Sequence, residues 1–104
     1  MMKMIVAIIN GDDASTVAEE LNRDGITCTK INSKGGYLKA GNTTLISGVD
    51  ENRVEHALEV IRKNTKKRTL TFHDMYGNVR GMPLEITVGG ATVFVLDVEQ
   101  FIKM

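Results

Sequence analysis

The densest group of residues with binding chemistry lies in segment 34–44, which reads Lys-Gly-Gly-Tyr-Leu-Lys-Ala-Gly-Asn-Thr-Thr. Its glycines open backbone conformations closed to other residues, and successive N–H groups in such a loop can form a concave anion site. Tyr37 can stack on a flat ring, while Asn42 and Thr43 can orient a ligand through hydrogen bonds. The segment therefore indicates a nucleotide-binding loop, although a glycine-rich hairpin with an exposed tyrosine fits the same residues.

Residues that could perform catalysis are few and scattered. One cysteine and two distant histidines, His56 and His73, are too few for a zinc site. Cys28 has no histidine or helix start near it in the sequence, so we expect a buried, unreactive thiol. Asp12 and Asp13 are better explained as helix caps than as paired catalytic acids. We therefore expect a binding protein that has no enzymatic activity and needs no cofactor or metal.

The composition is that of one soluble domain spanning residues 1–104, with 42% hydrophobic residues. Thirteen basic and thirteen acidic residues cancel, which argues against a nucleic-acid partner. No apolar run approaches the length of about 20 residues that spans a bilayer, and the first residues do not resemble a signal peptide. The single cysteine cannot form an internal disulfide. We therefore expect a cytoplasmic protein without a membrane partner.

The hydrophobic pattern predicts the elements that must position the glycine-rich segment. Apolar residues with helical spacing predict helices around 14–21 and 54–61, the first started by Asp12 or Asp13 and stopped by Gly25, the second started by Asp50. Apolar runs predict strands at 2–9, 26–31, 43–49, 68–73, 84–88 and 91–96. The continuous runs at 2–9 and 91–96 are typical of buried central strands.

This order of elements contains two β-α-β halves, with an additional hairpin before the last strand. It predicts an α+β, ferredoxin-like (βαββαβ) sheet with both helices on one face. The other face then needs cover, and we expect half-polar side chains on it, among them Thr27, Thr29, Leu45, Thr69 and Thr71. A second copy of the chain is the natural cover, so the sequence predicts an oligomer.

Segments 2–8, 35–44, 48–49 and 89–96 together resemble the PII-like cyclic di-AMP receptor family, and the similarity runs nearly from end to end. The resemblance implies a homotrimer of ferredoxin-like subunits that functions in signal transduction. It also implies cyclic di-AMP bound in the clefts between adjacent subunits, under two mobile loops, without enzymatic activity.

The resemblance also implies a set of ligand contacts. Thr29 would bond toward a phosphate or an adenine edge, Asn42 would read a base edge, and Gly48 would let the ligand approach the backbone. An adenine would lie between Gly36, Tyr37 and Leu38, with Tyr37 where the family usually has phenylalanine. The neighbouring wall would be the turn Gly89, Gly90 and Ala91.

Two departures from the family pattern bear on the ligand. Thr27 also belongs to the implied ligand-binding set, but it stands where these receptors commonly carry an arginine, so a bidentate, permanently charged phosphate partner is missing. Lys30, Lys34 or Lys39 could substitute as point charges. The loop 74–83 is shorter than in the receptors and lacks their proline-containing insert.

The leading hypothesis is a PII-like sensor of cyclic di-AMP with an unidentified protein target. The alternatives are a PII-like sensor of another adenine nucleotide, such as ATP or AMP, and a non-binding interaction module of the same fold. An enzyme on this scaffold would need a general base or nucleophile near the glycine-rich loop, and none stands out.

Overall fold

The computed structural model describes residues 1–32, 41–72, 84–88 and 90–104, with the strands at 68–72 and 84–88 described by their backbone alone. The described elements follow one another in this order: β1 (Met2–Asn10), α1 (Gly11–Arg23), β2 (Cys28–Asn32), β3 (Asn42–Asp50), a 3₁₀ turn (Glu51–Arg53), α2 (Val54–Lys63), β4 (Arg68–Phe72), β5 (Leu84–Val88) and β6 (Ala91–Asp97).

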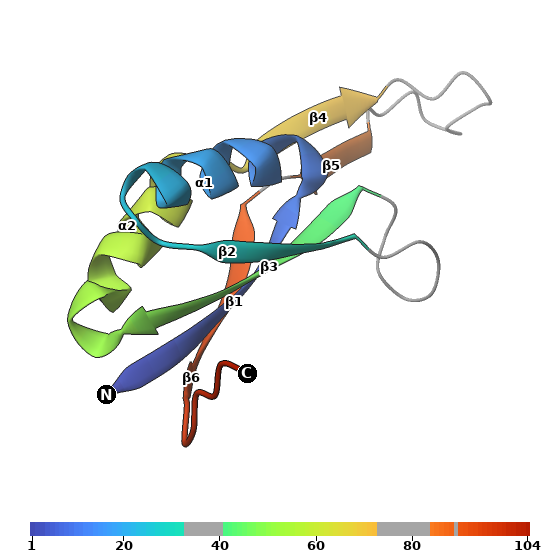
Figure 1. Ribbon diagram of the computed structural model, residues 1–104. Coiled ribbons are helices and arrows are strands. Elements are labelled where there is room, and N and C mark those ends of the chain that lie inside the picture. The colour runs from blue at the N-terminus through green and yellow to red at the C-terminus, as the bar shows by residue number, and fades with distance from the viewer. Residues whose placement is uncertain (33–40, 73–83, 89) are drawn as a thin grey trace.

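Four strands form one sheet in the order β2-β3-β1-β6, and all neighbouring strands in it are antiparallel. Both helices lie on the same face of this sheet (Figure 1). Strands β4 and β5 pair with each other as a separate hairpin between α2 and the last strand. The predicted ferredoxin-like fold with an additional hairpin is therefore confirmed, with β6 in the place of its fourth strand.

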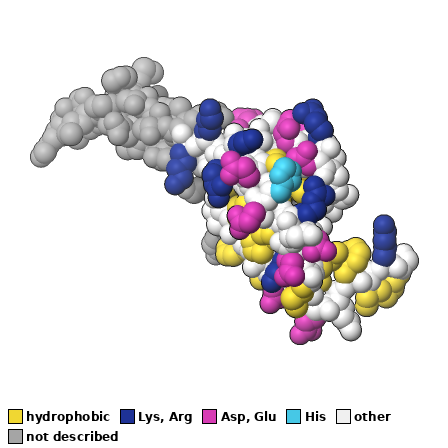
Figure 2. All heavy atoms as spheres, turned by 90° about the vertical axis from the view of Figure 1, so that its left-hand side faces the viewer, with side chains coloured by type: hydrophobic (Ala, Val, Ile, Leu, Met, Phe, Trp, Pro, Cys, Tyr) yellow, Lys and Arg dark blue, Asp and Glu magenta, His cyan; other side chains and the backbone are white. Residues whose placement is uncertain are grey.

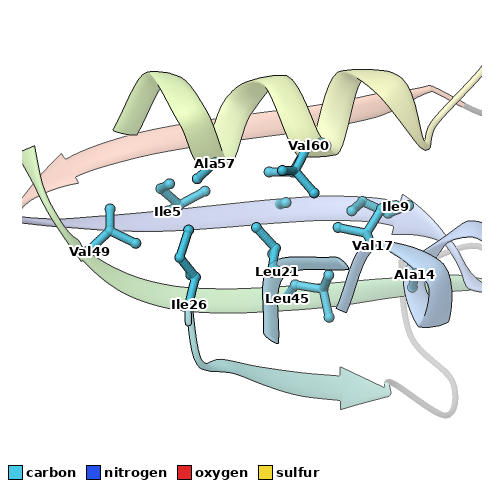
Figure 3. Close-up of a cluster of buried hydrophobic side chains, with 12 residues drawn as sticks. Ile5, Ile9, Ala14, Val17, Leu21, Ile26, Leu45, Val49, Ala57 and Val60 are labelled. Atoms are coloured by element: carbon cyan, nitrogen blue, oxygen red, sulfur yellow. The ribbon is translucent and has the colours of Figure 1, made fainter. Parts of the chain in front are cut away.

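The core lies between this sheet and the two helices (Figure 3). Strand β1 buries every second residue, and these side chains meet the apolar stripes of both helices because a strand repeats every two residues and a helix every 3.6. The largest fully buried side chains are Ile9, Leu45 and Val17. The opposite face of the sheet, which we call the open face, has no helix against it among the described residues.

Of the two predictions for the ends of α1, one is wrong and one is confirmed. Helix α1 begins directly after β1, and its cap is Asn10, whose Oδ1 accepts a hydrogen bond from the Asp12 N–H at 2.9 Å. The prediction that Asp12 or Asp13 caps this helix is wrong; both lie in its first turn, where carboxylates favour the helix dipole. The predicted stop at Gly25 is confirmed, since this residue follows the helix with a φ of 79°.

Strand β6 was predicted to be central, and this prediction is wrong. Within the described sheet it is an edge strand that pairs with β1 alone. Its side chains Phe94, Val95 and Leu96 remain 53%, 44% and 43% exposed. A continuous apolar run is typical of burial on both faces. Here Val93 packs against the core on the helix-covered face, whereas Phe94 and Leu96 on the open face remain about half exposed.

Leu45 was expected on the open face, and this is also wrong. The register that pairs Ala7 with Leu45 places Leu45 on the helix-covered face, where it is only 2% exposed. Polar residues also lie on that buried side of β3, so the sequence of this strand does not alternate cleanly between apolar and polar residues. Thr43 donates to Asn32 Oδ1 at 3.2 Å, and Ser47 donates to a backbone carbonyl at 2.7 Å, so their hydroxyls are satisfied inside.

Candidate ligand-binding site

Three residues predicted to contact a ligand, Thr27, Thr29 and Gly48, come together on the open face. The register pairs Thr29 with Ile46, whose side chain lies on the face away from the helices. Gly48 lies two residues further along β3 and therefore belongs to the same face. Ser47 donates from its Oγ to the Thr27 carbonyl at 2.7 Å and thereby fixes the backbone just before β2. The three residues line one pocket of about 640 Å³.

The pocket has a floor from the sheet and a wall from the C-terminal segment, residues 98–104. The floor consists of Met2, Met4, Gly25, Thr27, Thr29, Ile46 and Gly48, and the wall of Val98, Gln100, Phe101 and Lys103. Hydroxyl groups, apolar side chains, an aromatic ring and an ammonium group therefore face one space. This mixture suits a ligand that combines flat rings with anionic groups.

Gly48 lines the pocket with backbone alone, because it has no side chain to fill the space. A Cβ placed on it would meet only Met2 Sδ, at 3.6 Å, which is an ordinary van der Waals contact. Its φ is not positive, so the backbone does not require glycine at this position. The missing side chain instead leaves room where a ligand can approach the strand.

The other described candidates, Asn42, Gly90 and Ala91, line a second pocket of about 240 Å³ near the Asn10 end of β1. Gly90 has a φ of 77°, a left-handed conformation that favours glycine, and a Cβ on it would make a tight contact of 3.1 Å with Lys67 Cγ. The 640 Å³ pocket lies at the other end of β1, beside Met2 and Met4. One chain therefore holds the candidates in two separate groups.

Gly36, Tyr37, Leu38 and Gly89 lie outside the described residues, and so do Lys34, Lys39 and His73. Lys30, the third lysine considered as a substitute for the missing arginine, is described. It alternates with Thr29 and faces the helices, where its Nζ donates to Ser15 Oγ at 3.0 Å. Lys30 therefore does not face the pocket.

The prediction missed the C-terminal wall of the pocket. Phe101 and Lys103 follow β6 in a segment without regular secondary structure, so no periodicity in the sequence assigns them to a face. Met4 and Ile46 could have been placed on the floor, since each alternates with a buried neighbour along its strand.

Cys28 and His56, the described residues considered above for catalysis or metal binding, do not line the pocket. Burial raises the pKa of the Cys28 thiol, an effect that the positive charge of Lys30 opposes, and the side chain packs partly buried against the core. His56 Nε2 lies 2.9 Å from Asp24 Oδ2 at the surface. Among the described residues, no three side chains of the metal-binding types gather at one place.

The surface charges are mixed on the side of the molecule that carries α2. Figure 2 shows acidic and basic side chains interspersed there, without a large area of either sign. In the described part of the chain, neither helix has the length and apolar character needed to cross a bilayer.

The topology places the chain in the class of small, ferredoxin-like α+β domains. Residues 2–104 match the family model described as the cyclic-di-AMP receptor, and the chain belongs to this family. The chain is also similar to a crystal structure of a functionally unknown protein from Pediococcus pentosaceus ATCC 25745, with 35% identity and a TM-score of 0.75. That similarity covers 99% of this chain and 97% of the other. The family suspected from the sequence is confirmed, and it is a family of receptors, not of enzymes.

Proposed function

We propose that this protein binds cyclic di-AMP in the clefts between the subunits of a homotrimer and passes the signal to an unidentified protein through the loops around the site. The observation that carries the proposal is the convergence of Thr27, Thr29 and Gly48 on one pocket of about 640 Å³. The resemblance alone implies these residues as ligand-binding positions, and the fold brings all three to one pocket.

The chemistry of the pocket fits the parts of the ligand. Cyclic di-AMP consists of adenosine units whose riboses are joined through phosphodiesters, which are anionic at neutral pH. The hydroxyls of Thr27 and Thr29 can donate hydrogen bonds to phosphate oxygens. Ile46 and Phe101 offer apolar and aromatic surface on which an adenine can lie.

The division of the candidates into two groups supports a site between subunits. In a ring of copies related by rotation, one end of each subunit meets a different end of the next. The pocket beside Met2 in one subunit would then face the Asn42 and Gly90 group of its neighbour. Each cleft of the ring would combine the two groups into one site.

The apolar surface left uncovered in a single chain supports the same assembly. Phe94 and Leu96 are exposed on the open face of β6, and Ile31 is exposed on the same face at the opposite edge of the sheet. The β4–β5 hairpin pairs with no other described strand, and an isolated two-stranded hairpin is marginally stable in water. Neighbouring copies of the chain would cover both features.

Isothermal titration with cyclic di-AMP, together with the mass in solution from light scattering, tests the proposal. We expect a trimer that binds the ligand. We expect a Thr29→Val variant to bind about 2- to 10-fold more weakly, because it replaces the hydroxyl by a methyl group of similar size. Thr16→Val, on the exposed side of α1, is the matched control and should bind as the wild type does. A monomeric protein, or a wild type that gives no heat with cyclic di-AMP, would refute the proposal.

An adenine mononucleotide such as ATP or AMP is the second candidate ligand. It is favoured by the volume of the larger pocket, which within one chain already reaches the range of sites for small molecules. Competition separates the two candidates: a mononucleotide sensor would bind ATP or AMP more tightly than cyclic di-AMP.

A further inference from the structure

An anionic ligand in the larger pocket needs a positive partner, and β2 does not provide one. Thr29 of this strand and Thr27 just before it line the pocket, and both are neutral. Lys30 is directed to the other face and bonds to Ser15 Oγ. Lys3 is also turned away, since it forms an ion pair with Asp97.

The C-terminal segment crosses to the pocket from the edge of the sheet. After β6 the chain reverses direction and ends on the side of the sheet that faces away from the helices (Figure 1). The Val98 N–H donates to the Met2 carbonyl at 3.2 Å, which ties the start of the segment to β1. This anchor places Phe101 and Lys103 along the pocket wall.

Lys103 is the one basic side chain among the described residues that line this pocket. No acidic side chain lines it in the same described set, so its ammonium group has no competing carboxylate within the pocket. Lys103 in the C-terminal wall and the two threonines in the floor thus line the same space. A phosphate between them would receive donors from both sides.

From this geometry we infer that Lys103 is the phosphate-binding cation of the site and that the C-terminal segment is a functional part of the ligand pocket. The inference rests on the proposed function, because it assumes a phosphate-bearing ligand. It assigns the positive charge to the C-terminal wall instead of to strand β2. Removing the last residues would therefore weaken ligand binding while leaving the sheet and core in place.

The test compares Lys103→Gln, which removes the charge at similar length, with Lys103→Arg, which retains it. Lys63→Gln is the control, since Lys63 is exposed in the last turn of α2 and lines none of the described pockets. Titration with cyclic di-AMP at low and high salt gives the affinity and its salt dependence. We expect Lys103→Gln to bind about tenfold more weakly with a reduced salt dependence. Lys103→Arg and Lys63→Gln should stay within about twofold of the wild type.

The outcomes separate the two proposals. If the wild type binds and Lys103→Gln matches it in affinity and salt dependence, the role of Lys103 is refuted while the proposed function stands. If the wild type itself does not bind cyclic di-AMP, the proposed function fails and the inference fails with it. Circular dichroism of each variant shows whether the fold is kept, and the exposed position of Lys103 predicts that it is.

Discussion

Replacing Gly48 by alanine should make the protein more stable and its ligand binding weaker. Glycine within a strand is less favourable than alanine by roughly 0.5–1 kcal/mol, because it loses more conformational freedom on folding. The added Cβ meets only Met2 Sδ at 3.6 Å, so no clash offsets the gain. In a domain of this size, each kcal/mol raises the melting temperature by about 4–8 °C. We therefore expect a rise of a few degrees, measured by thermal denaturation.

The same methyl group should oppose the ligand. It occupies the floor of the pocket that also contains Thr29, and overpacking of a fitted site typically costs about 1–3 kcal/mol, or roughly 5- to 150-fold in affinity. Titration calorimetry with cyclic di-AMP measures this loss. The opposite signs of the two effects are the informative feature, because a substitution that merely damaged the fold would lower stability and affinity together.

Gly11→Ala is the matched control, for which we expect lower stability and unchanged ligand binding. A Cβ on Gly11 would lie 2.9 Å from the Gly41 carbonyl oxygen, so Gly11→Ala should destabilise the fold, although the residue lines none of the described pockets. If Gly48→Ala lowered the melting temperature, or bound cyclic di-AMP as tightly as the wild type, the argument that Gly48 is kept for the ligand would be refuted.

Two further predictions concern the scaffold. Asn10→Ala removes the cap that bonds to the Asp12 N–H and should lower the free energy of unfolding by about 1 kcal/mol in urea denaturation, whereas the exposed Asn22→Ala should not. The side-chain hydrogen bond to Asp97 raises the pKa of Lys3 above 10.5, so the pair stabilises the fold below that pH and its contribution is lost as pH rises through the raised pKa. The difference in stability between the wild type and Asp97→Asn should therefore shrink in urea titrations above pH 10.5, and a constant difference up to pH 12 would contradict this.

The order of elements was predictable because each carries a local signal. The helices have apolar stripes at helical spacing, and Gly25 takes a positive φ after the first of them. The cap at Asn10 was not predictable with the same ease, since Asn10, Asp12 and Asp13 are all good capping residues and only the exact end of β1 decides among them. The wrong prediction for Leu45 has a different cause. Leu45 and Ser47 lie on the same face of β3, and a serine normally indicates a solvent-facing side, whereas here the Ser47 hydroxyl is buried and hydrogen-bonded.

The site was predictable only where it lies on strands. Thr29 and Gly48 belong to neighbouring strands, so a correct register is enough to bring them together. Lys103 depends on how the segment after β6 folds back, which is determined by tertiary contacts such as the bond from Val98 to Met2. Such contacts have no period in the sequence, so the wall of the pocket could not be inferred from it.

The error over β6 is itself informative about assembly. Its residues are those of a strand buried on both faces, and yet Phe94 and Leu96 lie on the open face with about half of their surface exposed. A sequence selected for a solitary domain would place polar or charged side chains along such an edge, because an exposed apolar edge strand promotes aggregation. The composition of β6 therefore fits a strand whose cover comes from another molecule. Since the larger pocket opens on the same face, a ligand bound in it and a second molecule packed on β6 would influence each other, which is what a receptor needs in order to report ligand binding.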